Sequence, residues 1–88
     1  MTRSLSDAAQ SRSAIRAKII DLARRRGVDA SRLLDSDVIP DTGVLDSVGI
    51  LELITWFEMT FDLTIAQPDL SVENFGTVDA MVRYLERH

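Results

Sequence analysis

Residues 47–61 read SVGILELITWFEMTF, and this stretch decides the fold class. At about 100° per residue, five of its apolar side chains fall within one arc of about 100°, which predicts an amphipathic helix with that arc facing the core. The residues of this stripe are Ile50, Leu53, Ile54, Phe57 and Phe61. No run of the chain alternates apolar and polar residues as a half-buried strand would. The sequence therefore predicts an all-α protein.

Another amphipathic segment precedes this one and predicts a helix over residues 9–26. In it, Ile15, Ile19 and Leu22 recur at helical spacing. Three consecutive arginines and then Gly27 follow, which is typical of a helix C-terminus. Cations there meet the negative end of the helix dipole, and glycine readily adopts the left-handed backbone that ends a helix.

The C-terminal part of the chain predicts one short helix and one longer one. Residues 71–75 are expected to form a single helical turn that ends at Gly76. Thr77 is expected to cap a last helix that runs to about residue 87. The apolar face of that helix consists of Val78, Met81, Val82 and Leu85. The predicted architecture is a four-helix bundle of three main helices and one short helix.

A long connection, residues 28–46, joins the first two main helices and contains Pro40 and Gly43. Connections of this length are unusual in small domains and are often functional. Its apolar residues are expected to pack onto the core rather than extend into solvent. They are Leu33, Leu34, Ile39 and Leu45.

Composition excludes several classes of function. Among 88 residues, ten are basic and fourteen acidic, and this net charge of −4 argues against nucleic acid as the main partner, because phosphate binding needs a basic face. Cysteine is absent and His88 is the only histidine, so thiol nucleophiles, Cys-ligated zinc and Ser–His pairs have no residues to be built from. The sequence predicts neither a catalytic site nor a metal site, and an enzyme is not expected.

No membrane-spanning or targeting segment is predicted. Glu52 and Glu58 interrupt the most apolar segment, which stays short of the roughly 18 apolar residues of a membrane span. The N-terminal residues are polar and lack the apolar run of a signal peptide. The cytoplasm is therefore the expected compartment. A monomer is expected by default, because the sequence carries no signal for an oligomeric state.

The candidate site lies where the long connection enters the second main helix. Asp46 and Ser47 stand there in succession. Unpaired backbone N–H groups and the positive end of the helix dipole favour an anionic group attached at such a junction. Ser and Asp are also the common N-cap residues, so an ordinary cap is the alternative interpretation. Unaided catalysis by Ser47 is not expected, because no base is available to activate it.

The second main helix also carries apolar residues on the face away from the core. An apolar stripe with a carboxylate among it is typical of a docking surface for other proteins. The candidate residues of this partner face are Val48, Glu52, Thr55, Trp56 and Met59. The alternative is that Trp56 and Met59 pack against the connection or the short helix.

Together these features resemble the acyl and peptidyl carrier protein family. Residues 44–48 (VLDSV) resemble its Asp-Ser-Leu attachment motif, and the downstream order also matches, with Glu-x-x-Phe at residues 58–61 and Phe-Gly-Thr-Val at residues 75–78. The resemblance covers about residues 12–87. It implies a flexible tail over residues 1–8 and, over residues 9–88, a carrier domain with the four-helix bundle of acyl carriers.

The resemblance also implies a function. In this family the serine that matches Ser47 is esterified by 4′-phosphopantetheine, which a separate Mg²⁺-dependent transferase takes from coenzyme A. The arm holds an acyl or aminoacyl group as a thioester, so the cofactor supplies the sulfur that this cysteine-free chain lacks. Asp46 matches the residue that helps the transferase handle the serine and its metal. The implied partners are a phosphopantetheinyl transferase, an acyl- or aminoacyl-activating ligase and a downstream acyltransferase or synthase.

Two departures from the family pattern bear on the subclass. Val48 replaces the usual leucine, and the first helix is basic where fatty-acid carriers are acidic. Gly49 and the Val-Leu-Asp-Ser run of residues 44–47 resemble discrete carriers of amino-acid activation or specialised acyl pathways, so a small aminoacyl or short acyl cargo is expected.

The alternative function is an unmodified helical interaction module that uses the same partner face. A calcium-binding helix pair is rejected, because Ile39 and Pro40 stand where the calcium loop needs an oxygen ligand and a glycine.

Overall fold

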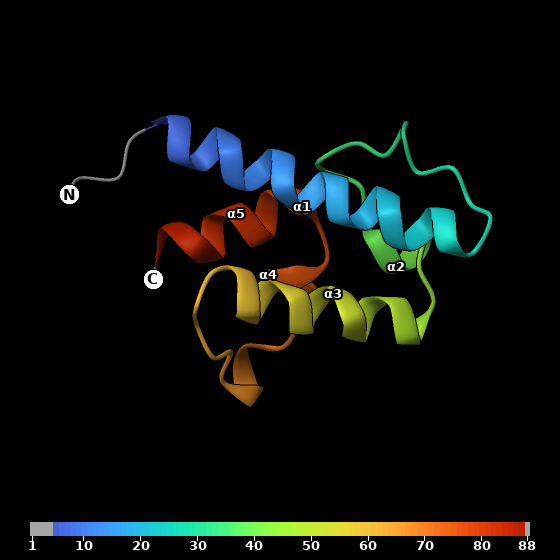
Figure 1. The fold of residues 1–88 in the computed structure, drawn as a ribbon. Coiled ribbons are helices and arrows are strands. Elements are labelled where there is room, and N and C mark those ends of the chain that lie inside the picture. Colours follow the sequence, from blue (N-terminus) through green and yellow to red (C-terminus); the bar gives the residue numbers. More distant parts are fainter. Residues whose placement is uncertain (1–4, 88) are drawn as a thin grey trace.

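Three long helices and two short ones make up the described part of this computed structural model (Figure 1). The backbone is described for residues 5–87 and the side chains for residues 8–87. No strand occurs within this range, and the predicted all-α fold class is confirmed. In chain order the elements are α1 (Leu5–Arg25), α2 (Ile39–Thr42), α3 (Ser47–Thr60), the 3₁₀ turn η1 (Gln67–Asp69), α4 (Val72–Phe75) and α5 (Val78–Glu86).

Two of the helix ends carry the capping residues that the sequence predicts. Gly27 has a φ of 76°, and its amide donates to the carbonyl of Arg24 at 2.9 Å, which closes the C-terminus of α1. The hydroxyl of Thr77 accepts a hydrogen bond from the amide of Ala80 at 2.9 Å and caps α5. Both capping predictions are therefore confirmed.

Two helices differ from the prediction. α1 begins at Leu5 rather than at residue 9, and residues 1–4 of the expected tail lie outside the described residues. The sequence predicts no helix within residues 28–46, where the structure has α2. A helix of four residues is too short to show an apolar period, so periodicity could not detect it.

The core lies where α1 packs against both α3 and α5, with α4 packed on α5. The expected apolar faces of α1 and α5 are buried. On α3, Leu53 and Phe57 are buried at the centre of the predicted stripe, while Ile50, Ile54 and Phe61 are half-buried at its edges. The helical period therefore predicted correctly which side of α3 faces inward.

Aromatic rings fill the space between α3, α4 and α5. The ring centroid of Phe57 lies 5.4 Å from that of Phe75 and 5.0 Å from that of Phe61. Phe75 in turn lies 4.7 Å from Tyr84, whose hydroxyl donates to the carboxylate of Asp69 at 3.0 Å. This cluster joins the C-terminal half of α3 to the C-terminal part of the chain.

A side-chain hydrogen bond follows the end of α3. The carboxylate of Glu58 accepts from the amide of Ile65 at 2.8 Å, and Asp62 turns the chain with a φ of 52°. The side chain of Ile65 is consequently buried. This contact is the structural role of the glutamate in the Glu-x-x-Phe pattern.

The apolar residues of the long connection pack onto the core, with one exception. Leu33, Ile39 and Leu45 are buried as expected, but Leu34 is 62% exposed, so its expected burial is wrong. The amide of Leu34 donates to the carboxylate of Asp37 at 2.8 Å, in a turn that directs the side chain outward. Neighbouring residues such as Leu33 and Leu34 cannot both face the core in this turn.

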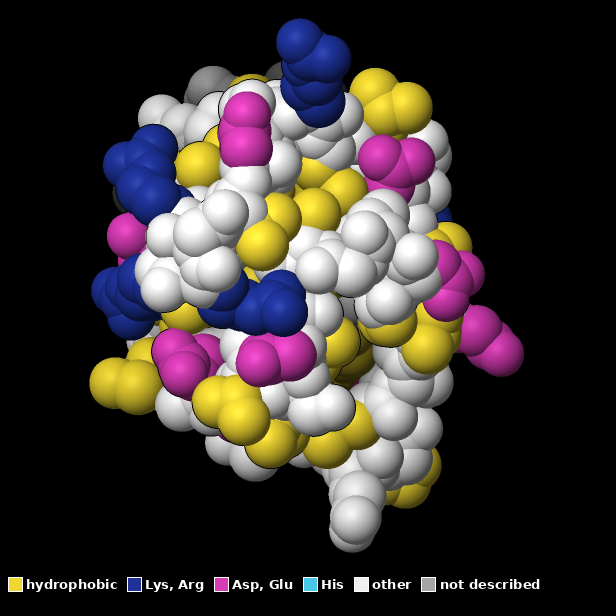
Figure 2. All heavy atoms as spheres, turned by 90° about the vertical axis from the view of Figure 1, so that its right-hand side faces the viewer, with side chains coloured by type: hydrophobic (Ala, Val, Ile, Leu, Met, Phe, Trp, Pro, Cys, Tyr) yellow, Lys and Arg dark blue, Asp and Glu magenta, His cyan; other side chains and the backbone are white. Residues whose placement is uncertain are grey.

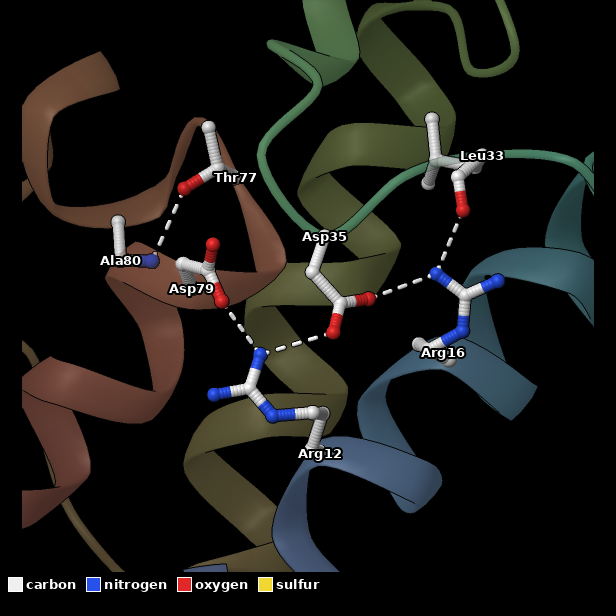
Figure 3. Close-up of polar contacts among 7 residues, drawn as sticks. All are labelled: Arg12, Arg16, Leu33, Asp35, Thr77, Asp79 and Ala80. Carbon is white, nitrogen blue, oxygen red and sulfur yellow. Dashed lines mark hydrogen bonds and ion pairs between the residues drawn. The ribbon is translucent and has the colours of Figure 1, made fainter. Parts of the chain in front are cut away.

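An ion-pair network fixes the connection to α1 and α5 (Figure 3). Arg12 donates to Asp35 at 2.9 Å and also to Asp79. Arg16 donates to the second oxygen of Asp35 at 2.8 Å and to the carbonyl of Leu33 at 2.7 Å. Partial burial acts to raise the pKa of Asp35, but the hydrogen bonds from Arg12 and Arg16 outweigh it and leave this pKa below its ordinary value.

This network predicts a pH-dependent contribution to stability. Because the folded-state pKa of Asp35 is lowered, its stabilisation is present above the unfolded-state pKa and is lost as the pH falls through the folded-state value. We expect Asp35→Asn to lower the free energy of unfolding at pH 7 by about 1 kcal/mol. Urea unfolding between pH 7 and pH 2 measures this, and the deficit should vanish at acid pH. Asp41→Asn is the matched control, since Asp41 is exposed and makes no ion pair among residues 8–87; an equal deficit there would contradict the prediction.

Candidate functional site

The segment of residues 43–46 links α2 to α3 and leads into the site. Gly43 ends α2 with a φ of 74°, a left-handed conformation that favours glycine. The hydroxyl of Thr42 accepts from the amide of Val44 at 3.3 Å, and Leu45 buries its side chain in the core. A turn and an apolar anchor therefore contribute to the path of the chain just before Ser47.

Asp46, not Ser47, is the N-cap of α3. Its backbone is extended, and its Oδ1 accepts from the amide of Gly49 at 2.8 Å. Gly49 is buried, and a Cβ there would lie 3.3 Å from both Asp46 Oδ1 and the side chain of Leu45. A small residue at this position keeps the cap close to the helix.

Ser47 is consequently left without a capping role. It is the first residue of α3 and is exposed. Within the described residues, its hydroxyl has no hydrogen-bond partner. The positive end of the helix dipole lies beside it, which favours a phosphate ester at this oxygen. The sequence left open whether Ser47 is only a helix cap or a reactive serine. In the structure the preceding residue, Asp46, makes the cap, so the oxygen of Ser47 is available for chemistry.

The electrostatic surroundings of the site are mixed. The end of the bundle where α1 ends and α3 begins carries basic and acidic side chains next to one another among apolar ones (Figure 2). The Oδ2 atom of Asp46 lies 3.8 Å from Nε of Arg26, which follows α1. No cluster of three acidic or histidine side chains that could hold a metal ion occurs in the described part of the chain.

The expected partner face borders an open groove of about 700 Å³ between α1 and α3. Val48 and Met59 are 62% and 76% exposed, and Glu52 and Thr55 are exposed beside them. Trp56 is only half-buried, with its ring edge-to-face against Phe61 at 5.8 Å. The structure therefore places all five expected residues along this groove, and the indole of Trp56 also packs against Phe61.

Sequence reasoning missed several residues around the site. Leu51 is 65% exposed and Lys18 of α1 forms the far wall of the groove. A second, smaller hollow of about 300 Å³ lies between α2, α3 and α4, where Leu70 and Val72 are exposed. The signal for Leu51 was its position outside the core stripe of α3. Lys18 could not be placed, because its distance from α3 depends on how the helices pack.

Comparison with known proteins agrees with this geometry. The family model described as "Phosphopantetheine attachment site" matches residues 14–85. The chain belongs to this family of phosphopantetheine-binding carrier proteins. The D-alanyl carrier proteins of Streptococcus pyogenes serotype M5 (strain Manfredo) and serotype M1 are each 36% identical to it over 58 residues. That alignment covers 66% of this chain and 72% of each relative. No solved structure matches significantly.

Membership defines the general role of this carrier protein. It carries covalently bound 4′-phosphopantetheine and is not itself an enzyme. The exposed hydroxyl of Ser47 fits such a group, because a phosphoester at this oxygen breaks no hydrogen bond among the described residues. None of the described helices is both long enough and apolar enough to cross a membrane.

Proposed function

We propose that Ser47 is the attachment point of the carrier and that the loaded protein presents a small aminoacyl or short acyl group to partner enzymes. The observation that carries the proposal is the exposed Ser47 hydroxyl at the start of α3, left free because Asp46 makes the cap. When bound, the phosphopantetheine group supplies the thiol on which the cargo is held. The protein contributes the fixed position of the serine and the surface that partners recognise.

Attachment of the phosphopantetheine group is a phosphoryl transfer to the oxygen of Ser47. Ser47 Oγ forms a phosphoester bond with the phosphopantetheine phosphate of coenzyme A, and the pyrophosphate bond of coenzyme A breaks. The adenosine bisphosphate part of coenzyme A is the leaving group, and the Oγ proton passes to a base of the transferase. Asp46 immediately precedes Ser47. Its Oδ2 takes no part in the cap and lies 3.8 Å from Nε of Arg26, beyond hydrogen-bond distance, so this oxygen can still bind the transferase metal.

Two observations favour a small cargo. The similar proteins from Streptococcus pyogenes are named for D-alanine, a small amino acid. The rings of Phe57, Phe61, Phe75 and Tyr84 occupy the space between α3, α4 and α5, which leaves less room for a long acyl chain inside the bundle. Loading assays with candidate acids and their ligases, including D-alanine, identify the cargo.

The partners that the proposal requires are a phosphopantetheinyl transferase, an activating ligase and a downstream acyltransferase or synthase. The partner face of Val48, Glu52, Thr55, Trp56 and Met59 is proposed as their common docking surface. Its exposed apolar residues supply contact area, and Glu52 contributes to partner choice and association rate.

The partner face predicts a selective effect on docking. Met59→Glu is expected to raise the KM of the transferase for this protein about tenfold, because a charge is then buried in an apolar contact. Thermal unfolding should stay close to wild type, since Met59 is 76% exposed. Leu34→Glu is the matched control, because it places the same charge at another exposed apolar residue, outside the groove. Equal KM values for the two variants would contradict the partner face.

Intact-mass measurement tests the proposal as a whole. After incubation with coenzyme A, Mg²⁺ and a broad-specificity phosphopantetheinyl transferase, the protein should gain the mass of one phosphopantetheine group. The alternative function, an unmodified interaction module using the same face, predicts no gain in mass. An unmodified protein under conditions that load a known carrier would overturn the proposal.

A further inference from the structure

We infer that Arg26, just after the C-terminus of α1, is a positioning residue that holds residues 43–46 in the arrangement in which Ser47 is loaded. This inference rests on the proposed attachment at Ser47. Arg26 binds the carbonyl groups of Gly43 and Val44, which lie 17 and 18 positions later in the sequence. It therefore joins two parts of the chain that only the fold brings together.

The contacts of Arg26 converge on the linker before the serine. Its Nη1 donates to the carbonyl of Val44 at 3.0 Å and to that of Gly43 at 3.2 Å. Its Nε lies 3.8 Å from Oδ2 of Asp46, the carboxylate oxygen that the helix cap does not use. One guanidinium group therefore touches three of the four residues between α2 and α3.

The other contacts of residues 43–46 join this linker to parts of the fold other than the end of α1. Leu45 buries its side chain in the core, and Asp46 Oδ1 binds the amide of Gly49 within α3 itself. Among the described residues, only Arg26 binds the carbonyl groups of Gly43 and Val44. Without Arg26, the linker keeps the buried Leu45, the Asp46 cap and the hydrogen bond from the Val44 amide to Thr42, but it loses the contacts that join its carbonyl groups to the end of α1.

Loss of this tie should affect recognition more than chemistry. A linker that samples several arrangements presents Ser47 correctly only part of the time, and apparent affinity falls in proportion to that fraction. Once the transferase is bound, it holds the linker itself, so the rate of the bound complex stays the same. The expected signature is a raised KM for this protein with an unchanged kcat.

The neighbouring Arg25 is a matched control. It carries the same charge at the same helix end, but its guanidinium pairs with Asp21 at 2.9 Å, one turn earlier in α1. Arg25→Ala thus removes one positive charge near the site and leaves the linker contacts intact. Any effect common to both variants is an effect of charge alone.

The test measures transferase kinetics with coenzyme A and Mg²⁺ for wild type, Arg26→Ala and Arg25→Ala. Arg26→Ala should raise the KM for this protein about fivefold relative to Arg25→Ala, with kcat within about twofold. The unfolding temperature of each variant is measured by circular dichroism, and the assay is run well below the lowest of these temperatures. Arg26→Met, which keeps the aliphatic stem and removes the donors, is assayed alongside and should reproduce the raised KM.

Other results would overturn the inference. Equal KM values for Arg26→Ala and Arg25→Ala would show that only charge matters, and a lowered kcat at unchanged KM would contradict a positioning role. Ser47→Ala in the same assay distinguishes failure of the proposed attachment point from failure of the proposed role of Arg26. If Ser47→Ala is still loaded, the proposed attachment point fails and the role of Arg26 fails with it. If Ser47→Ala is not loaded and Arg26→Ala behaves as Arg25→Ala, the role of Arg26 alone fails.

Discussion

Ser47→Ala is expected to abolish loading with phosphopantetheine completely, because no other oxygen occupies the first position of α3. The variant should fold normally, since the hydroxyl of Ser47 makes no hydrogen bond with any described residue and Asp46 keeps the cap. Intact-mass measurement after incubation with coenzyme A and transferase checks the first expectation, and far-UV circular dichroism checks the second.

Ser36→Ala is the control for this experiment. Ser36 is an exposed serine in the long connection, so its replacement tests whether the transferase modifies accessible serines in general. Ser36→Ala should load at the wild-type rate. Persistence of the adduct on Ser47→Ala would refute the assignment of the attachment point, and the position of the adduct would then be found by peptide mapping.

Phe57→Ala is expected to cause the largest loss of stability, about 3–5 kcal/mol in the free energy of unfolding. Phe57 is only 1% exposed, and its ring contacts those of Phe61 and Phe75. Its removal leaves a cavity that rigid neighbouring rings fill poorly. Because the loss is comparable to the total stability of many small domains, a large fraction of the variant should be unfolded at 37 °C.

The measurement is urea unfolding followed by far-UV circular dichroism. Met59→Ala is the matched control, since Met59 lies two residues further along the same helix and is exposed. It should change the free energy of unfolding by less than about 0.5 kcal/mol. Similar losses for the two variants would mean that the aromatic cluster does not stabilise the bundle as the contacts indicate.

Local sequence patterns predicted most of α3 and its surroundings. The apolar period placed Leu53 and Phe57 inward and Val48 and Met59 outward, and the structure confirms both sides of the helix. The period works here because the helix is fourteen residues long and shows several turns. It failed for α2, which has only four residues and therefore no period to read.

The sequence could not decide which of two adjacent capping residues serves as the cap. Asp46 and Ser47 both suit an N-cap, and their order alone leaves two registers possible. In the structure the extended backbone of Asp46 aims its carboxylate at the amide of Gly49. Packing of Leu45 into the core holds the backbone in that register, and so it also decides that Ser47 faces outward.

What the amino-acid sequence determined by itself was local: helix periods, the caps at Gly27 and Thr77, and the absence of any cysteine that could serve as the reactive group. Only the tertiary structure decided which distant groups meet. Arg26 reaches the linker before Ser47, and Asp35 receives both Arg12 and Arg16. Helix periods and caps depend on residues within about one helical turn of each other, and the order of these residues can be read directly from the sequence. Contacts between segments far apart depend on how whole helices pack, and no spacing along the chain reveals that.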